Sequence, residues 1–257
     1  SPDPDLTFDD VMGFLVPVTT DVSDVRSGRI VVGFNWTAVE GLFPSGAVLG
    51  LAASPSKSDG AQTTSDTGSF GGRTLSDLAP MALSPNPYER AIGIAACNAH
   101  WTALAKRPGA AGLSGLTSGG ADGLSAAPGE RVVVIGRFPG LDRKIPQALV
   151  LEKRPGPDDI PAERAPEIIP NADRLIITAS TLVNGSIDGL IALARPDCAI
   201  TLVGPGTPLC PGLFLQRVDR LAGFIVTETD TCIKAVMEGA GARAFRKHGR
   251  PVLLTPS

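Results

Sequence analysis

The chain has 257 residues, of which 43% are hydrophobic and 19% are charged, and its formal net charge is −3. This length suits one large domain or two modest ones, and the composition is ordinary for a globular protein. The charge balance and the lack of a Lys/Arg-rich run argue against a nucleic-acid partner. No stretch of the sequence approaches the roughly 18 to 20 apolar residues needed to cross a bilayer, which argues against a membrane protein.

The four cysteines, Cys97, Cys198, Cys210 and Cys232, lack paired spacing. In a chain of this size they predict reduced thiols of a cytoplasmic protein rather than a disulfide framework. The acidic start, Ser1–Asp5, is not typical of a signal peptide, and removal of such a peptide before this numbering is left open.

The first third of the chain predicts a small α+β unit. The segments Arg29–Phe34 and Ala47–Ala53 are rich in apolar and β-branched residues, and the Gly and Pro residues between them predict a hairpin. The polar segment Asp59–Gly72 predicts a mobile loop. A short helix is expected over Thr74–Leu83.

A clearer helix follows. Asn86 is a candidate N-cap, Pro87 suits the first helical position, and Glu89 stands where the acid of a capping box would reach back. The segment Tyr88–Leu104 then carries apolar residues near helical spacing, and the helix is expected to end before Pro108.

A change of composition suggests two units. The segment Gly109–Gly129 is rich in Gly, Ala, Ser and Leu and has few charges, which is typical of a linker. We therefore expect an α+β domain over residues 1–108, a linker over 109–128 and a second domain over 129–257.

The second domain alternates between strands, loops and helices. Such alternation predicts a Rossmann-like, mostly parallel sheet. The predicted strands are Arg131–Ile135, Ala148–Leu151, Arg174–Ile177, Ala199–Val203, Gly223–Val226 and Val252–Leu254, and the predicted helices are Pro161–Glu167, Ser186–Ala194 and Asp230–Phe245.

Three of these strands run into loops of Gly, Pro, Ser and Thr, namely Gly136–Gly140, Thr178–Gly185 and Gly204–Pro208. Ligands bind outside the carboxyl ends of the strands in an open α/β sheet, so the three loops predict one shared small-molecule site. The candidate ligand-binding residues in these loops are Gly136, Arg137, Phe138, Ser180, Thr181, Asn184, Gly204, Pro205 and Thr207.

The first loop lacks the G-x-G-x-x-G pattern of a dinucleotide site, which disfavours classical NAD binding. Glu152 nevertheless falls near the end of the next strand, where a ribose-binding acid would stand. Gly136 either lines a ligand or makes a simple turn. Arg137 either holds an anion in bidentate fashion or pairs with a surface acid.

The second loop offers hydroxyls and an amide just before a predicted helix, which suits a carboxylate, a phosphate or another polar ligand. The alternative is that Asn184 only caps the helix that begins near Ser186. The third loop, Gly204–Pro208, is stiffened by prolines, so it either lines a pocket or makes a tight connection.

Metal ligands are sparse in the sequence. Cys97 and His100 share one helical face, but a structural zinc site usually needs four ligands, so a core cysteine beside a partly buried histidine is favoured. Asp158 and Asp159 either bind a hard cation or form a solvated turn. The metal ligands, like any catalytic residues, are therefore left unassigned.

One basic cluster stands near the last predicted helix. Its members are Arg243, Arg246, Lys247 and Arg250. Cations are favoured at the carboxyl end of a helix, so the cluster is expected to be a solvated helix end.

Several short motifs in order resemble a known family. The motifs are Glu89–Gly93, Asn98–Ala99, Val134–Pro139, Ala172–Arg174, Thr181–Asp188 and Gly204–Pro208. They are similar to those of the family described as "putative heavy-metal chelation", and the resemblance extends from about Gly28 to the end of the chain. It implies a domain like the N-terminal domain of enolases, followed by a Rossmann-like domain, with a site between them to which the Asn98 region also contributes.

Three functions follow as hypotheses. The first is a small-molecule-binding protein whose ligand is a metal ion or a metal–chelator complex, or a protein that processes such a complex. The second is an enzyme acting on a phosphorylated or nucleotide-like substrate, and the third is a non-catalytic binding or scaffold protein. Enzymatic activity and assembly into a homo-oligomer are left open.

Overall fold

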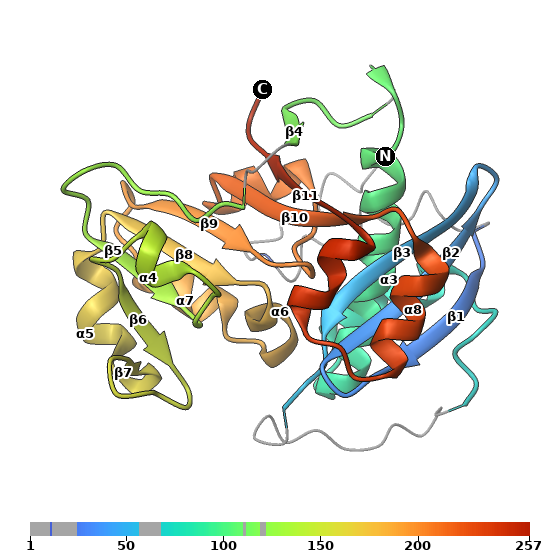
Figure 1. Ribbon diagram of the computed structural model, residues 1–257, viewed down its shortest axis with the longest axis horizontal. Coiled ribbons are helices and arrows are strands. Elements are labelled where there is room, and N and C mark those ends of the chain that lie inside the picture. Colours follow the sequence, from blue (N-terminus) through green and yellow to red (C-terminus); the bar gives the residue numbers. More distant parts are fainter. Residues whose placement is uncertain (1–10, 12–24, 57–67, 110–111, 119–121) are drawn as a thin grey trace, which may run out of the picture.

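A computed structural model describes residues 11, 25–56, 68–109, 112–118 and 122–257. Most of the predicted loop Asp59–Gly72 lies outside these ranges. The described chain forms a three-stranded antiparallel sheet and an eight-stranded, mostly parallel sheet, which lie side by side (Figure 1). The α/β fold class predicted from the sequence is thus confirmed.

The small sheet is a meander of β1 (Ser27–Val32), β2 (Trp36–Phe43) and β3 (Gly46–Ala53). The predicted hairpin was wrong because β2 lies between its two strands. A charged residue in the middle of β2 interrupts its apolar pattern. That residue, Glu40, is 6% exposed and accepts hydrogen bonds from the Arg29 side chain on the neighbouring strand.

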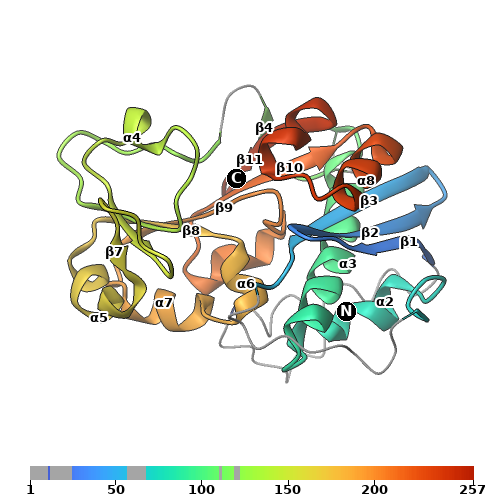
Figure 2. The same ribbon diagram turned by 60° about the horizontal axis from the view of Figure 1, so that its bottom comes forward.

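Helices cover both faces of the small sheet. Helix α3 (Pro87–Ala105) lies on one face, and α8 (Thr229–Met237), from the far end of the chain, lies on the other (Figure 2). Residues 91–103 of α3 are all buried because the helix also faces the layer of the large sheet. Its contact with β3 is close: a Cβ added to Gly50 would lie 1.9 Å from the carbonyl oxygen of Ala95.

The start of α3 is capped as expected, with one difference. The Oδ1 atom of Asn86 accepts a hydrogen bond from the Tyr88 amide over 2.9 Å. Glu89, however, does not complete a capping box, because its carboxylate accepts from the hydroxyl of Ser84. The same Ser84 oxygen accepts from the Asn86 amide over 3.1 Å and so takes the place that Glu89 was expected to fill.

The large sheet has the strand order β4-β11-β10-β9-β8-β5-β6-β7. Six neighbouring strands, β10 to β7, are parallel, and β11 is antiparallel to β10 and to β4. The six predicted strands are all present with boundaries shifted by up to three residues. The bounds are β4 (Leu116–Ser118), β5 (Val132–Ile135), β6 (Leu149–Glu152), β7 (Ile160–Pro161), β8 (Arg174–Thr178), β9 (Ala199–Val203), β10 (Arg220–Val226) and β11 (Gly249–Leu254).

The order of the parallel strands reverses once. The chain runs from β5 through β6 to β7 on one side, and then returns to the other side of β5 for β8, β9 and β10. This order, third-second-first-fourth-fifth-sixth, is that of the Rossmann fold, and its switch point lies between β5 and β8. The short helices are α2 (Leu75–Leu78), η3 (Ala79–Leu83), α4 (Leu141–Lys144), η5 (Ala162–Arg164), α5 (Ala165–Ile168), η6 (Ile169–Asn171), α6 (Ser180–Asn184), α7 (Ile187–Leu193), η7 (Pro211–Gln216) and η8 (Ala242–Lys247).

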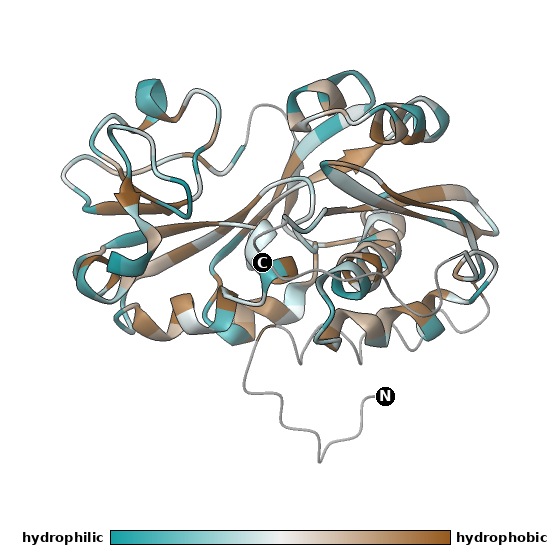
Figure 3. Cartoon of the chain, turned by 90° about the horizontal axis from the view of Figure 1, so that it is seen from below, coloured by the Kyte–Doolittle hydropathy of each residue, from teal (hydrophilic) through white to brown (hydrophobic). Residues whose placement is uncertain are grey.

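The two faces of the large sheet are covered differently. One face packs Leu175, Ile177 and Leu202 into a core that continues through α3 into the small sheet. The other face packs Val134 and Ile176 against α4 and neighbouring loop residues. Hydrophobic residues are concentrated on the strands, whereas the helices carry both kinds of residue (Figure 3). None of the helices in the described ranges combines the length and the apolar character that crossing a membrane requires.

Candidate functional site

A cavity of about 410 Å³ lies at the carboxyl ends of β5, β6 and β8, where the strand order reverses. We call it the switch-point pocket. Six of the predicted ligand-binding residues lie in its wall, together with Glu152 and Thr178 from the ends of β6 and β8. The six are Gly136, Arg137, Phe138, Ser180, Thr181 and Asn184.

Gly136 has a positive φ of 89° directly after β5. A Cβ at this position would lie 3.0 Å from the methyl group of Thr178 on the neighbouring strand. Glycine is therefore required by the backbone conformation as well as by the close neighbour. The turn brings the following loop, with Arg137 and Phe138, over the end of the sheet.

The Arg137 side chain forms ion pairs with acidic side chains, which is one of the two roles predicted for it from the sequence. Its guanidinium group forms ion pairs with Asp142 and with Asp159, whose carboxylate is 6% exposed. The hydrogen bond from Arg137 lowers the pKa of Asp159, and the same two acids raise the pKa of Arg137. The backbone amide of Arg137 donates to Oε1 of Glu152 over 2.6 Å. Arg137 thus orders the rim of the pocket through its charge partners.

The wall after β8 is a short helix, where the sequence had predicted a loop. The hydroxyl of Thr181 donates to the carbonyl oxygen of Thr178 over 2.7 Å, so its proton is already used in this local hydrogen bond. Ser180 and Thr178 share a hydroxyl–hydroxyl contact of 3.2 Å, in which either oxygen can donate. Thr178 was missed from the sequence, although its place at the last position of a parallel strand is a usable signal.

Asn184 is the last residue of α6, and its side chain fixes the connection between α6 and α7. Its Oδ1 accepts from the amide of Ser186 over 2.9 Å and from the hydroxyl of Ser186 over 2.6 Å. The residue therefore holds the chain just before α7. Among the described residues, its Nδ2 group and the Oε2 atom of Glu152 have no hydrogen-bond partner, so both are available to a ligand.

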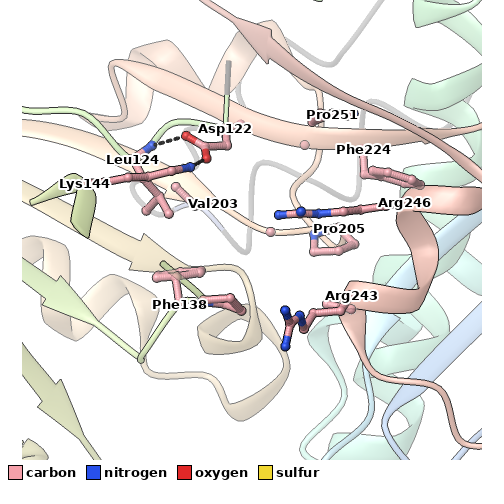
Figure 4. A pocket seen from close by; sticks show the side chains of 15 residues that line it. Asp122, Leu124, Phe138, Lys144, Val203, Pro205, Phe224, Arg243, Arg246 and Pro251 are labelled. Carbon is pink, nitrogen blue, oxygen red and sulfur yellow. Dashed lines mark hydrogen bonds and ion pairs between the residues drawn. The ribbon is translucent and has the colours of Figure 1, made fainter. Parts of the chain in front are cut away.

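A second cavity of about 510 Å³ adjoins the first and shares Phe138 with it. We call it the arginine pocket (Figure 4). Two further predicted residues, Gly204 and Pro205, lie in its wall. So do Arg243 and Arg246, which the sequence had assigned to a solvated helix end.

The geometry of η8 explains why the side chains of Arg243 and Arg246 lie on the same side of this helix. In a 3₁₀-helix there are three residues per turn, so side chains three positions apart eclipse each other. Both guanidinium groups therefore extend in the same direction, toward the wall that carries Phe138 and Lys144 (Figure 4). The spacing of three was visible in the sequence, but the 3₁₀ conformation was not.

The two remaining predicted residues line neither cavity. Asn98 is 4% exposed, and its Nδ2 donates to the carbonyl oxygens of Leu51 over 2.7 Å and Gly206 over 2.9 Å. Thr207 is likewise 4% exposed, in the loop after β9. Among the described residues, neither Oδ1 of Asn98 nor Oγ1 of Thr207 has a partner.

The four cysteines are all buried. Burial raises the pKa of Cys97 to about 12 and that of Cys210 to about 12. His100 packs edge-on against Trp101, with 4.8 Å between the ring centres, as a core residue does. In the part of the chain that the structure describes, no three His, Cys, Asp or Glu side chains are grouped to hold a metal ion.

Two solved structures resemble this fold along nearly its whole length. One is a protein of unknown function from the DUF364 family of Desulfitobacterium hafniense DCB-2, with 26% identity and a TM-score of 0.82, covering 98% of this chain and 100% of its own. The other is a DUF364 protein of unknown function from Pyrococcus horikoshii, with 22% identity and a TM-score of 0.80, covering 95% and 98%. No curated protein matches the sequence.

Two family models match the sequence itself, and both are described as "Putative heavy-metal chelation". DUF4213 matches residues 20–101, which include the small sheet and most of α3, and DUF364 matches residues 121–255, which include both cavities. Together with the shared fold, these matches confirm the resemblance seen in the short motifs. The chain belongs to the DUF364 family.

Proposed function

We propose that the protein binds a small polar molecule in the switch-point pocket, and that this molecule is a metal–chelator complex. The observation that carries the proposal is the convergence of the loops after β5, β6 and β8 on one cavity of about 410 Å³. Open α/β sheets bind their ligands at such a switch point, and small-molecule sites range from about 300 to 1,000 Å³. The family description supports the metal–chelator class.

The groups available in the pocket suit a ligand rich in oxygen. The hydroxyl of Ser180 and the Nδ2 group of Asn184 can donate to carboxylates, and Oε2 of Glu152 can accept from hydroxyls or from metal-bound water. Hydrogen bonds of this kind hold a complex through its chelator. The metal would then need no cluster of protein ligands.

The proposed site lies next to the junction between the two proposed units, 1–108 and 129–257. Helix α6 carries Ser180 and Asn184, and it packs against α3 of the first unit. Arg90 of α3 donates from Nε to the carbonyl oxygen of Val183 in α6 over 2.7 Å. The first unit thereby supports one wall of the pocket, although none of its described residues lines the cavity.

Calorimetric titration tests the proposal. Ni²⁺, Zn²⁺ and Cu²⁺ are added alone, citrate is added alone, and each metal is added as its citrate complex, while native mass spectrometry identifies any molecule retained during purification. We expect a complex to bind and Ser180→Ala to weaken it about 3- to 10-fold, the usual effect of one lost hydrogen bond. Ser45→Ala, an exposed serine of the β2–β3 turn, is the matched control. Absence of any retained molecule and of binding to metal, chelator and complex would refute the proposal.

A second candidate is an enzyme for a nucleotide-like substrate. It is favoured by the Rossmann strand order together with the position of Glu152 at the end of β6, where an acid can bind a ribose hydroxyl. Nucleotides and S-adenosylmethionine would be screened by thermal shift. A ligand at 100 times its Kd stabilises by about 2.7 kcal/mol, so a flat screen would exclude this candidate.

A further inference from the structure

The arginine pocket lies over the β9–β10–β11 part of the large sheet, which a loop and short helices cover in the described chain. Val203 of β9, Ala222 and Phe224 of β10, and Pro251 of β11 contribute to its apolar surface. Parallel sheets normally have both faces covered by helices. In the described chain, α4 stands to one side of this surface and η8 to the other, and the cavity of about 510 Å³ remains between them (Figures 2 and 4).

The charges around this surface do not cancel. Lys144 of α4 forms an ion pair with Asp122, so these two balance each other. Arg243 and Arg246 have no carboxylate partner among the described residues, and both reach into the cavity (Figure 4). The pocket therefore has two uncompensated positive charges above an apolar floor.

We propose that the arginine pocket is a second binding site, which takes a small anion with a flat apolar body, such as an aromatic carboxylate or sulfonate. Arginine presents its donors in a planar fork that matches such oxyanions. The apolar body would lie against Phe138, Phe224 and Pro251, which line the cavity and are not fully buried. This site is lined by different residues from the switch-point pocket, apart from Phe138, and does not rest on the function proposed for that pocket.

Two related fluorescent probes separate recognition of the negative charge from binding of the apolar ring system. 8-Anilinonaphthalene-1-sulfonate carries the ring system and a negative charge, whereas N-phenyl-1-naphthylamine carries the same ring system without the charge. We expect the full-length protein to bind one molecule of the sulfonate saturably. In the double variant Arg243→Ala/Arg246→Ala, binding of the sulfonate should weaken at least tenfold, while binding of the neutral probe should change less than twofold.

Matched variants control for folding and for general charge. Lys247→Ala removes a neighbouring charge of η8 that does not line the pocket, so it should leave both affinities unchanged. Ser180→Ala should also leave them unchanged, because Ser180 belongs to the other pocket. Arg243 and Arg246 are exposed, so the double variant should keep the unfolding temperature of the original protein.

Three results would overturn the proposal. One is a lack of saturable sulfonate binding to the folded protein. Another is an equal loss of both probes in the double variant, which would indicate an apolar surface without anion selectivity. The third is an equal loss of the sulfonate in Lys247→Ala, which would indicate general attraction by the basic surface.

Discussion

Asn98, in the middle of α3, donates a hydrogen bond to the carbonyl oxygen of Gly206, in the loop after β9, over 2.9 Å. The same Nδ2 group donates to Leu51 of the small sheet, so one buried amide connects three parts of the fold. Asn98→Ala would leave two buried carbonyl oxygens without this donor. We expect it to lower the free energy of unfolding by about 1 to 3 kcal/mol, measured by urea denaturation.

The control for Asn98 is Asn35→Ala. Asn35 also donates from Nδ2 to a backbone carbonyl, that of Gly239 over 2.7 Å, but it is exposed. Water can replace this bond, so we expect a loss below about 1 kcal/mol. Equal losses in the two variants would contradict the importance of burial at Asn98.

Arg29 joins the small sheet to the last α-helix. Its guanidinium group pairs with Glu40 of β2 at 2.5 Å and with Asp230 of α8 at 2.6 Å. The Glu40 side chain is 8% exposed, so Arg29→Met would leave a buried carboxylate without its charged partner and with only the Arg29 backbone amide as a donor from that residue. We expect a loss of about 2 kcal/mol in the free energy of unfolding. This is less than the roughly 3 to 5 kcal/mol of a fully buried pair, because Arg29 itself is half-exposed.

The second partner of Arg29 provides a comparison. Asp230 has a side chain that is 84% exposed, and exposed ion pairs contribute roughly 0 to 1 kcal/mol. Asp230→Asn should therefore change the urea midpoint only slightly. If Asp230→Asn lowered the stability as much as Arg29→Met does, the contact of Arg29 with α8, rather than the burial of Glu40, would account for the stabilising effect of Arg29.

Two glycine-to-alanine substitutions should change the free energy of unfolding in opposite directions. A Cβ at Gly50 would lie 1.9 Å from the carbonyl oxygen of Ala95, so Gly50→Ala must push α3 away from the sheet. We expect a loss of about 3 kcal/mol, at the upper end of typical overpacking. Gly189, exposed in α7, has nothing within 4 Å of an added Cβ, and Gly189→Ala should gain about 0.5 to 1 kcal/mol. Thermal unfolding of both variants would check the two signs.

Asp173, just before β8, should make the stability depend on pH. Hydrogen bonds from Arg131, and then from Arg195, lower the pKa of this carboxyl in the folded state. Its unfolded pKa is about 3.9, so its stabilising contribution is fully present above that pH and is lost as the pH falls toward the folded value. Asp173→Asn should therefore be less stable than the original protein at pH 7. The difference should narrow as the pH is lowered from about 4 to 2 in a series of urea titrations.

The control for the pH series is Asp197→Asn. Asp197 also pairs with Arg195, but its side chain is 78% exposed, so its loss should have little effect at any pH. A difference between Asp173→Asn and the original protein that stays constant down to pH 2 would contradict the assigned role of Asp173.

The buried thiols should resist modification in the folded protein. Burial raises the pKa of Cys97 to about 12, that of Cys210 to about 12 and that of Cys232 to about 11, and the reactive species is the thiolate. We expect almost no reaction with Ellman's reagent under native conditions at pH 8. In guanidinium chloride all 4 cysteines should react rapidly. Fast reaction of one thiol in the native protein would show that the surrounding core opens.

The sequence predicted five of the six parallel strands because each of the five contains a compact apolar run, whereas β7 has only two residues, Ile160 and Pro161, and was missed. β2 was missed because Glu40 interrupts its pattern, and only its pairing with Arg29 across the sheet makes that charge acceptable in the interior. Helix α6 was missed because its Ser, Thr and Val residues have no strong helical preference. Packing against α3 supports it instead, and such long-range contacts are not visible in a local pattern.

The sequence could indicate only those candidate residues whose positions follow from the order of the strands. Residues that directly follow parallel strands meet at one edge of the sheet, so Gly136, Ser180 and Gly204 could be selected from the chain order alone. Arg243 and Arg246 could not, because their direction depends on the 3₁₀ conformation of η8 and on where η8 packs. The burial of Asn98 likewise depends on a contact with Gly206, 108 residues away.

The position of α8 has a consequence for synthesis on the ribosome. Ala38, Leu49 and Leu51 of the small sheet are buried against Ile233 and Phe245, which are translated only after the parallel strands of the large sheet. While the intervening chain is made, that apolar face of the nascent small sheet has no cover. A chaperone that binds exposed apolar surface would therefore meet this protein early, and release would follow translation of α8 and η8.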